Sequence, residues 1–464
     1  MLAGLETHGR ILSGEFHPAG RTREWCDAEV LRRIRRRTLA RLRGEVAPVD
    51  ATGYARFLPA WHGIGVGGAP SKRLDEALAQ LEGAPVPFSD LERAILPVRV
   101  PGFEPRLLDE RGALGQVVWI GCGSLGERDG RVALYRRDRV PLLLERAAPP
   151  ADLAPLPAAL LAHLELRGAC FFSELVAASG GATEKDVLAA LWDLVWLGLA
   201  TNDTFAPLRA LAHGALKRRP GRNAPSASAG RWSRVADLVP DSVEPTRRAH
   251  ARALVLLDRY GVLSREALLA EEIAGGFGAV YPVLRAMEEA GKLRRGHFVD
   301  GLDGAQFAFA GAVDQLRSAR GGSGAPDARL LAASDPANPY GALLPWPSLR
   351  DPAAGRPRRA AGAVVVMADG APALFLERSL RHALTFAGMG EGEPAAIAAA
   401  ALRDLFADRR RRAVRIERID GAEALASPLR TAFERAGFRA EYKGLVLDRF
   451  ASAPPPARDA RREG

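Results

Sequence analysis

One short segment, 330–347 (LLAASDPANPYGALLPWP), contains the residues whose types and spacing could do chemistry. Asp335 and Asn338 each precede a proline there. Proline fixes φ and keeps the residue before it out of the helical region, so we expect a stiff, non-helical loop. A carboxylate held in such a loop can stabilise positive charge nearby and accept a proton. The alternative is that Asp335 makes an Asx turn and only shapes the loop.

Two aromatic residues follow this Asp and Asn. Tyr340 and Trp346 are side chains that could stack on, or wedge beside, a base that has left a duplex, as chemistry on a base requires. Asp448, which ends the last expected strand, is a second carboxylate to consider. These residues make the loop a candidate site, with Asp335 and Asn338 at its centre.

The charge balance favours an anionic partner. Net charge is +10 and the pI is about 10.0, which indicates nucleic acid rather than membrane because no basic amphipathic helix with a broad apolar face stands out. An arginine-rich composition is the plain alternative. The predicted phosphate contacts are Arg32, Arg33, Arg36 and Arg37 in a helix over 27–43, with Arg294 and Arg295 in a later hairpin. Trp25 and Trp61 could stack on bases, although burial is the commoner fate of tryptophan.

Several kinds of site have no sequence support. The chain has neither a GxxxxGK[ST] phosphate loop nor a GxSxG elbow. The GCGSLG stretch at 121–126 leads into a turn and a strand rather than a helix, so it should not hold a dinucleotide. Three distant cysteines give no metal pair. We therefore expect no cofactor, no metal and no ATP site, and the absence of a secretory leader or long apolar stretch suggests a cytoplasmic protein without membrane contact.

A repeat organises much of the chain. LETHGRILSGEF (5–16) aligns without a gap to MEEAGKLRRGHF (287–298), and LVWLGLATND (194–203) is a looser copy. The pattern predicts a helix that ends at glycine and is followed by a β-hairpin. Helical blocks before the two later copies complete the layout of a winged helix. Only four residues precede the first copy, so we expect the chain to begin inside a winged helix.

These patterns predict an α+β chain of tandem winged-helix domains with β-barrel-like modules. We expect 95–140 to be β-rich, beginning with a strand at ILPVRVP, and 360–450 to contain strands joined by an Asp-Gly turn. The expected divisions are 1–45, an incomplete winged helix; 46–150, a helix plus a β-barrel-like module; 151–215, a winged helix; 216–231, a linker; 232–318, a winged helix; 319–329, a linker; 330–452, an α+β barrel-like domain; and 453–464, a disordered tail.

Several long stretches resemble the carboxyl-terminal region of Lhr-type (large helicase-related) bacterial helicases. They include GRILSGEFHPAGRTREWCDAEVLRRIRRRTLARLR, YARFLPAWHGI, VVWIGCGSLGERDGRVALY and SDPANPYGALLPWP. That region is similar in turn to AlkZ-like winged-helix DNA glycosylases, which carry Gln-x-Asp followed by Pro-x-Asn. Asp335, Pro336 and Asn338 match this pattern, but Ala333 stands where the glutamine would be. The resemblance implies cleavage of an N-glycosidic bond, with Asp335 and Asn338 as candidate catalytic residues. The carboxylate would stabilise positive charge on the sugar and accept a proton from water, without its water-positioning amide.

The resemblance implies a DNA-binding region of a repair helicase that lacks the ATPase motor and excises damaged or deaminated bases. Its expected partners are DNA, the helicase motor domains on the same or a separate chain, and a second copy in a homo-oligomer. The alternative is a non-catalytic module for DNA binding and oligomerisation. A transcription regulator is a weaker third hypothesis, because it would need neither the linkers nor the barrel-like segments.

Overall fold

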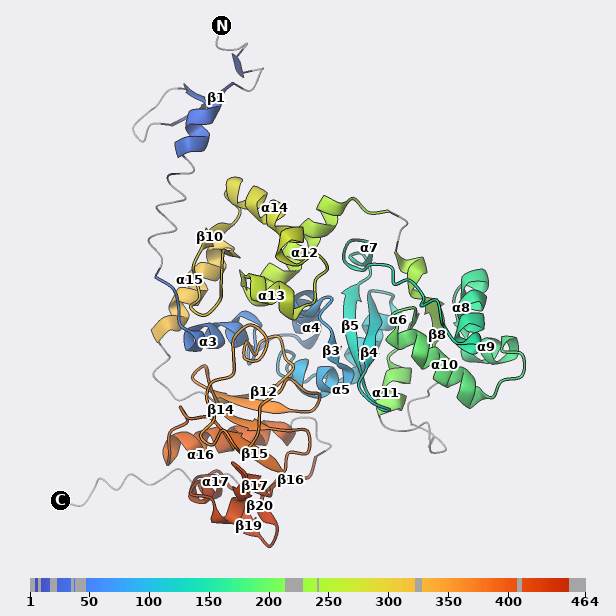
Figure 1. Cartoon of the computed structure of the whole chain (residues 1–464), viewed down its shortest axis with the longest axis vertical. Helices are drawn as coiled ribbons and strands as arrows, with labels where there is room; N and C mark the ends of the chain where they lie inside the picture. The colour runs from blue at the N-terminus through green and yellow to red at the C-terminus, as the bar shows by residue number, and fades with distance from the viewer. Residues whose placement is uncertain are drawn as a thin grey trace, which may run out of the picture.

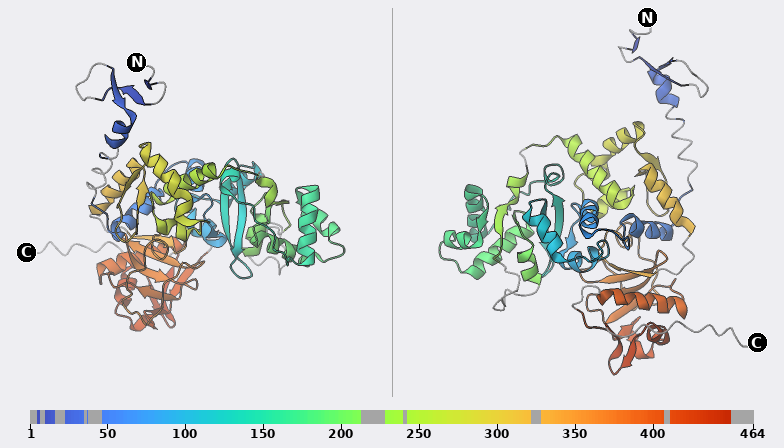
Figure 2. Two further views of the ribbon diagram at one scale, coloured as in Figure 1. Left: turned by 45° about the horizontal axis from the view of Figure 1, so that its top comes forward. Right: turned by 180° about the vertical axis from the view of Figure 1, so that it is seen from behind.

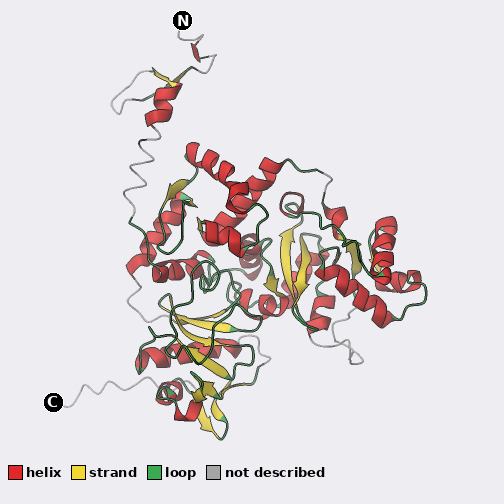
Figure 3. Ribbon diagram, in the orientation of Figure 1, coloured by secondary structure: helices red, strands yellow, loops and turns green. Residues whose placement is uncertain are grey.

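The computed structural model describes residues 5–6, 10–16, 23–34, 37, 47–212, 228–239, 242–321, 328–406 and 411–449. Helices and strands alternate through all of its parts, as Figure 3 shows in red and yellow. None of the helices in these ranges has the length and apolar content that a bilayer crossing requires. The mixed α+β class expected from the sequence is confirmed.

A short hairpin opens the described part of the chain. Strands β1 (Ile11–Gly14) and β2 (Glu24–Asp27) pair antiparallel, and residues 28–34 continue from β2 as a helix. This hairpin is the wing that the repeat predicts for 5–16. It lies apart from the other described elements in each view of Figures 1 and 2.

Three units in the middle of the chain share one topology, which we call the helix-and-wing units. Each has a helix, a short strand, further helical segments and two more strands, and in the second unit helix α11 (Ala206–Ala212) stands between those two strands. In every unit the last strand lies in the middle of a three-stranded antiparallel sheet, in the orders β3-β5-β4, β6-β8-β7 and β9-β11-β10. This is the layout of a helix-turn-helix with a β-hairpin wing.

The first helix-and-wing unit follows helix α3 (Ala51–Trp61). Its elements are α4 (Pro70–Leu81), β3 (Val86–Pro87), α5 (Phe88–Asp90), the π-helical turn η1 (Leu91–Ile95), α6 (Pro105–Ala113), β4 (Val117–Ser124) and β5 (Gly130–Arg136), with α7 (Val140–Leu143) after them.

The second unit comprises α8 (Pro155–Arg167), β6 (Cys170–Phe171), α9 (Phe172–Ala178), α10 (Glu184–Trp196), β7 (Ala200–Asn202), α11 (Ala206–Ala212), β8 (Arg231–Arg234) and η3 (Val235–Leu238). The third comprises α12 (Pro245–Tyr260), β9 (Val262–Leu263), α13 (Arg265–Ala270), α14 (Gly276–Glu289), β10 (Arg294–Gly296), β11 (Gln306–Ala308), α15 (Ala310–Ser318) and η4 (Ala319–Gly321).

One glycine begins each wing. The backbone φ is positive at Gly115, Gly198 and Gly291, at 66°, 70° and 74°. These glycines lie between helix α6, α10 or α14 and the first strand of the wing that follows it. Such a left-handed residue ends a helix at little steric cost only when it is glycine. The repeat seen at 194–203 and 287–298 therefore has a backbone cause, and the same device occurs at Gly115, where the sequence did not suggest a wing.

The stretch 95–140 differs from its expected form. The strand predicted at ILPVRVP is absent from the described residues there, because 91–95 is π-helical and turns follow it. Pro97 and Pro101 have no backbone N–H to donate to a sheet. Helix α6 was also missed. Only the later part, β4 and β5, pairs as the expected hairpin.

The GCGSLG stretch has a packing role. It forms the end of β4 and the turn toward β5, with no helix after it in the described chain. A Cβ at Gly121 would lie 2.3 Å from the carbonyl oxygen of Val195, so glycine lets β4 approach α10 closely. The expectation that this motif does not form a dinucleotide-binding turn agrees with that geometry.

The carboxyl-terminal domain has two sheets. Its elements are β12 (Ala328–Ala332), β13 (Val364–Ala368), β14 (Ala371–Leu376), β15 (His382–Thr385), α16 (Glu393–Ala400), η5 (Ala401–Phe406), β16 (Ala413–Ile416), β17 (Arg418–Ile419), β18 (Ala422–Glu423), η6 (Ala424–Ala426), α17 (Arg430–Arg435), β19 (Arg439–Glu441) and β20 (Gly444–Asp448). The expected Asp-Gly turn joins β13 to β14, with positive φ at Asp369 and Gly370.

No sheet in the described ranges closes on itself. The larger sheet of the carboxyl-terminal domain has the open order β12-β13-β14-β15-β17-β18, and the smaller has the order β16-β20-β19. Helix α16 packs against β12, β13 and β14, below the helix-and-wing units in Figure 1. The β-barrel-like modules expected over 46–150 and 330–452 are therefore not confirmed.

Two apolar cores join parts that are far apart in sequence. The first and second helix-and-wing units share one core, which includes Trp119, Leu191 and Trp232. The third unit shares another core with helix α3 and with the loop around Tyr340. The proline-rich loop of the carboxyl-terminal domain is thus packed into the centre of the molecule.

Candidate functional site

The loop with the predicted catalytic residues lies directly after β12 and is completely buried. Asp335 and Asn338 are both 0% exposed. The backbone N–H of Ala337 donates to Oδ1 of Asp335 at 2.8 Å, which makes an Asx turn. Asn338 donates through Nδ2 to the Ala333 carbonyl at 3.1 Å and accepts from the Tyr340 N–H through Oδ1 at 3.1 Å. Both side chains therefore shape the loop.

Asp335 forms a two-pronged ion pair with Arg99 of the first helix-and-wing unit. Nη1 and Nη2 of Arg99 donate to Oδ2 and Oδ1 of Asp335 at 2.8 Å and 2.6 Å, and both side chains are 0% exposed. Burial alone would raise the pKa of Asp335, but the Arg99 guanidinium outweighs it and holds that pKa below its usual value. A buried pair of this geometry strongly resists the loss of either partner.

His62 extends the pair toward the third unit. Its Nδ1 lies 3.0 Å from Nη2 of Arg99, and its Nε2 lies 2.8 Å from the Arg259 carbonyl oxygen. Because a guanidinium can only donate, Nδ1 accepts and the Nε2–H donates. Burial and the charge of Arg99 lower the pKa of His62 to about 3, so it is neutral at ordinary pH. The loop is thereby tied to helix α3 and to α12.

The main chain of the loop is held by a second arginine, Arg359, which is half-buried. Nη2 of Arg359 donates to the Ser334 and Asp335 carbonyls at 2.9 Å and 3.1 Å, and its Nη1 donates to the Asn338 carbonyl at 2.7 Å. Burial lowers the pKa of this guanidinium. Direct catalysis by Asp335 and Asn338 is not supported in this conformation, because neither side chain reaches water; their catalytic assignment stays a prediction.

Tyr340 packs inside the protein, and the half-buried Trp346 packs against it. Tyr340 is 3% exposed and donates through its hydroxyl to the Gly370 carbonyl at 3.1 Å. Its ring centroid is 6.1 Å from that of Trp346, which lies in turn 5.9 Å from Phe386. The structure brings these two aromatic residues together with Asp335 and Asn338, but as a packed cluster and not as an open stacking surface.

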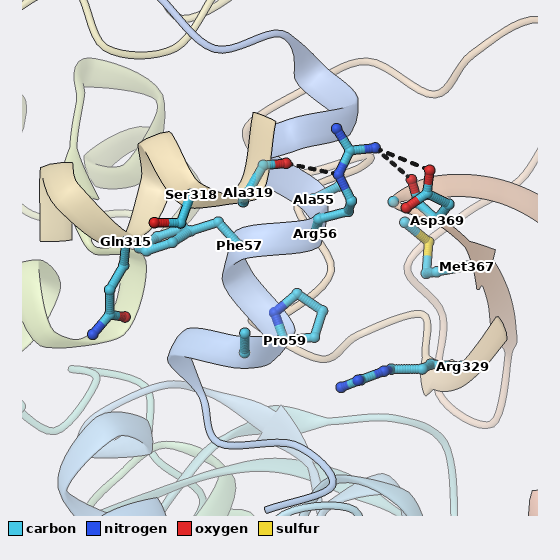
Figure 4. Close-up of a pocket in the computed structure, with 12 residues that line it drawn as sticks. Ala55, Arg56, Phe57, Pro59, Gln315, Ser318, Ala319, Arg329, Met367 and Asp369 are labelled. Carbon is cyan, nitrogen blue, oxygen red and sulfur yellow. Dashed lines mark hydrogen bonds and ion pairs between the residues drawn. The ribbon is translucent and has the colours of Figure 1, made fainter. Parts of the chain in front are cut away.

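A second contact between domains lies close to this cluster. Figure 4 shows Arg56 of α3 reaching Ala319 on one side and Asp369 on the other. Its Nε donates to the Ala319 carbonyl at 2.8 Å, and its Nη1 donates to the Asp369 carbonyl at 2.9 Å. The surrounding pocket of about 420 Å³ is mainly apolar. Arg56 thus connects the third unit to the β13–β14 turn.

The predicted DNA contacts in the first hairpin lie on the surface. Arg32, Arg33 and Arg37 are exposed, and Arg36 lies outside the described residues. Trp25 is 44% exposed on β2. These residues are brought together by the hairpin and its helix, and their exposure is compatible with contact to phosphates and bases.

The remaining predicted contacts lie in the third unit and beside it. Arg294 forms a long ion pair with Asp314 at 3.8 Å, and Arg295 lies over the rings of Tyr281 and Phe307 at 5.8 Å from each centroid. Trp61 is half-buried, and its Nε1 donates to the Asp258 carbonyl at 2.6 Å. Trp61 therefore packs against α12, far in sequence from the exposed Trp25.

Two further carboxylates are more accessible than Asp335. The side chain of Asp448 is 34% exposed and pairs with Arg439. Asp90, which the sequence did not single out, is 5% exposed and lines a cleft between the first unit and the carboxyl-terminal domain. Burial raises the pKa of Asp90 to about 6, although hydrogen bonds from Ser334 and Gly362 partly oppose that shift. No local sequence pattern could have indicated Asp90, since its partners come from more than 200 residues away.

Comparison with known proteins identifies two of the helix-and-wing units. Two family models described as "Large helicase-related protein, winged-helix domain" match residues 49–137 and 242–328. The first match covers the stretch expected to be a helix plus a β-barrel-like module, and the second overlaps the winged helix expected at 232–318. The tandem winged-helix prediction is confirmed by these matches, whereas the exact divisions proposed from sequence stay predictions.

Two curated relatives match over almost the entire chain. A protein of Mycolicibacterium smegmatis named "Lhr helicase/probable uracil glycosylase" is 40% identical over 452 residues, which are 92% of this chain and 30% of that protein. "Lhr helicase/uracil glycosylase" of Escherichia coli K12 is 35% identical over 470 residues, covering 91% of this chain and 30% of that protein.

Among solved structures, Streptomyces sahachiroi DNA glycosylase AlkZ is similar with a TM-score of 0.48 and 15% identity, covering 78% of this chain and 97% of that one. The chain spans 30% of the length of the two curated relatives above. It is thus similar to large helicase-related proteins over 30% of their length, and two of its domains match winged-helix models of that family.

Proposed function

We propose that this chain binds DNA through its helix-and-wing units and excises uracil, a deaminated base, as the glycosylase region of an Lhr-type repair helicase. The observation that carries the proposal is the 35–40% identity, over more than 90% of this chain, to two proteins whose names combine helicase and uracil glycosylase. Motor domains, on the same or a separate chain, and DNA are its proposed partners.

The surface charge supports the binding half of this proposal. The chain has a net charge of +10, and Arg32, Arg33 and Arg37 are exposed beside the exposed Trp25. Arginines contact phosphates without regard to sequence, and an aromatic face can stack on an unpaired base. These residues form the proposed first contact with a DNA strand.

The excision half requires a carboxylate that reaches the sugar. Asp335 and Asn338 remain the residues that the resemblance proposes, and they could act only if the Arg99 pair opened, because both are 0% exposed. The side chain of Asp448 is already 34% exposed and is the alternative among the residues considered from sequence. A carboxylate at either place would stabilise the positive sugar and accept a proton from water.

Both halves can be tested on the purified chain. Fluorescence anisotropy of a labelled duplex should show affinity that falls steeply with salt, and replacing Arg32, Arg33 and Arg37 by alanine should lower the slope of log K against log salt by about 3. An oligonucleotide containing uracil, treated with the chain and then alkali, should break at the uracil. Flat salt dependence would contradict the phosphate contacts, and absence of breaks would contradict excision.

A second function is favoured by one observation. The complete burial of Asp335 and Asn338 fits a non-catalytic module that positions DNA for the motor domains or assembles them into an oligomer. The alkali assay separates the two functions when Asp335→Asn and Asp448→Asn are included. Strand breaks equal to those of a sample without protein, together with salt-dependent binding, would favour the non-catalytic module.

A further inference from the structure

A cleft of about 680 Å³ separates the first helix-and-wing unit from the carboxyl-terminal domain. One wall comes from α5, η1 and the β4–β5 turn, and the other from β12, β13 and residues near Arg378. In Figure 1, α5 lies next to β12, and η1 packs against β12. The size falls within the range of small-ligand sites.

The rim of this cleft, meaning its exposed lining residues, is mainly basic, with Asp404 as an exposed carboxylate. Five arginines line it against three aspartates. Arg93 and Arg128 project from the first unit and Arg378 from the carboxyl-terminal domain, and all three are exposed. Within the described ranges none of these three guanidinium groups forms a hydrogen bond or salt bridge to the protein. Unpaired guanidinium groups on two facing walls can bind one phosphate between them.

The floor offers acceptors in fixed positions. Asp90 is held by the Ser334 hydroxyl at 2.7 Å and the Gly362 N–H at 2.9 Å. Asp129 accepts from the Ser89 hydroxyl at 2.5 Å and from the Gly130 N–H at 2.9 Å. Two carboxylates would repel a bare phosphate, so the floor requires a ligand part that donates hydrogen bonds.

Between rim and floor the walls are apolar. Ala94 and Val98 face the cleft from the first unit, and Leu331 and Val364 from the carboxyl-terminal domain. A flat ring with N–H donors on its edge, joined to a phosphate, matches the spatial order of basic rim, apolar walls and hydrogen-bond acceptors on the floor. A nucleotide has all three features, whereas a free phosphate has only the first.

We propose that this cleft binds one unpaired nucleotide of a DNA strand, with its phosphate on Arg93, Arg128 and Arg378 and its base edge toward Asp90 and Asp129. The inference rests on the proposed DNA binding and deepens it by naming the place where a single nucleotide enters. Such a site would hold a base that has left the stack, which a base-excising protein must accommodate.

Photo-crosslinking tests this site on the full chain. A single-stranded oligonucleotide with one 4-thiothymidine is irradiated with the protein, and mass spectrometry locates the adducts. We expect adducts in 89–98, 128–129 or 329–332. Arg93→Ala combined with Arg378→Ala should lower the yield about tenfold, because two charge-assisted contacts are lost. Ala94→Phe, which fills the apolar wall, should lower the yield as well.

A matched control removes the same charge from the same two domains. Arg106 and Arg381 are 75% and 62% exposed and lie outside the cleft lining. The Arg106→Ala/Arg381→Ala variant should crosslink like the wild type. Adducts confined to other regions, or an equal loss in this control, would overturn the cleft as the nucleotide site. Duplex anisotropy is measured in parallel: binding with adducts elsewhere refutes only the cleft, whereas no DNA binding refutes the proposed function and the cleft with it.

Discussion

Asp335 in the proline-rich loop and Asp90 in the cleft are both neighbours of Ser334. Asp335 follows Ser334 in the chain, and Asp90 accepts the Ser334 hydroxyl from 244 positions away. The two carboxylates nevertheless have opposite environments. Arg99 donates two hydrogen bonds to Asp335 and lowers its pKa. Among the described residues no arginine forms such a pair with Asp90, and burial raises the pKa of Asp90 to about 6.

The difference shows that a sequence motif and a carboxylate with a raised pKa need not coincide. The Asp-Pro-x-Asn-Pro pattern gives Asp335 a fixed direction, and the structure uses that direction to bind Arg99. Asp90 stands in an ordinary helical stretch, yet its raised pKa and its cleft are features that functional carboxylates often have. In this conformation the loop carboxylate is held in a buried ion pair, and the cleft is where we expect contact with a ligand.

The largest expected effect is on the stability of the loop. Asp335→Ala leaves the Arg99 guanidinium buried without its partner, which should lower the free energy of unfolding by about 3–5 kcal/mol. Urea denaturation followed by tryptophan fluorescence measures this. Asp303→Ala, at an exposed aspartate, should change stability by less than about 0.5 kcal/mol. A loss at Asp335 no larger than at Asp303 would contradict the structural role of the pair.

The next effect contrasts the pH dependence of the two acids. A folded pKa of about 6 for Asp90, above its ordinary 3.8, means that its contribution to stability is present at low pH and is lost as pH rises from 4 to 7. Asp90→Asn should remove this loss, so the variant should gain up to about 3 kcal/mol relative to wild type across that range.

Asp335 should behave in the opposite way. Because its folded pKa is lowered, its stabilising effect is present above the unfolded pKa and is lost as pH falls. Asp335→Asn should therefore differ most from wild type at neutral pH and least in acid. Denaturation curves at several pH values check both variants, and parallel pH profiles for the two would contradict the contrast between loop and cleft.

The smallest expected effect separates two tryptophans. Trp61→Phe loses the hydrogen bond to the Asp258 carbonyl, which should cost about 0.5–1.5 kcal/mol of stability. Trp25→Phe, at a 44% exposed position, should leave stability nearly unchanged. Thermal denaturation measures both. Equal changes would show that exposure in the hairpin does not distinguish Trp25 from Trp61.

The wings were predictable because their cause is local. A glycine with positive φ after a helix, followed by a strand, leaves a pattern within about ten residues, as at Gly198 and Gly291. The Asp369-Gly370 turn is local in the same way. The stiffness of the 333–346 loop and its Asx turn at Asp335 also follow from neighbouring residues.

The burial of that loop was not predictable, because its partners are distant. Arg99 lies 236 positions from Asp335, and the sequence around it, ILPVRVP, suggested a strand. His62 and Arg359 carry no local signal of their contacts either. The cleft arose from the meeting of two domains, so Arg93 and Arg378 could not be paired without the fold. From a single sequence, local backbone geometry can be predicted well, but the tertiary partners of a side chain can be predicted only poorly.

The most direct test of the contrast between loop and cleft is arginine footprinting. The full chain is treated with phenylglyoxal with and without single-stranded DNA, and mass spectrometry quantifies modification at each arginine. We expect Arg93, Arg128 and Arg378 to react freely and to be protected by DNA, while Arg99 stays unmodified in the sample without DNA. Cleft arginines that react equally in both samples, or Arg99 that reacts as fast as they do without DNA, would contradict the account.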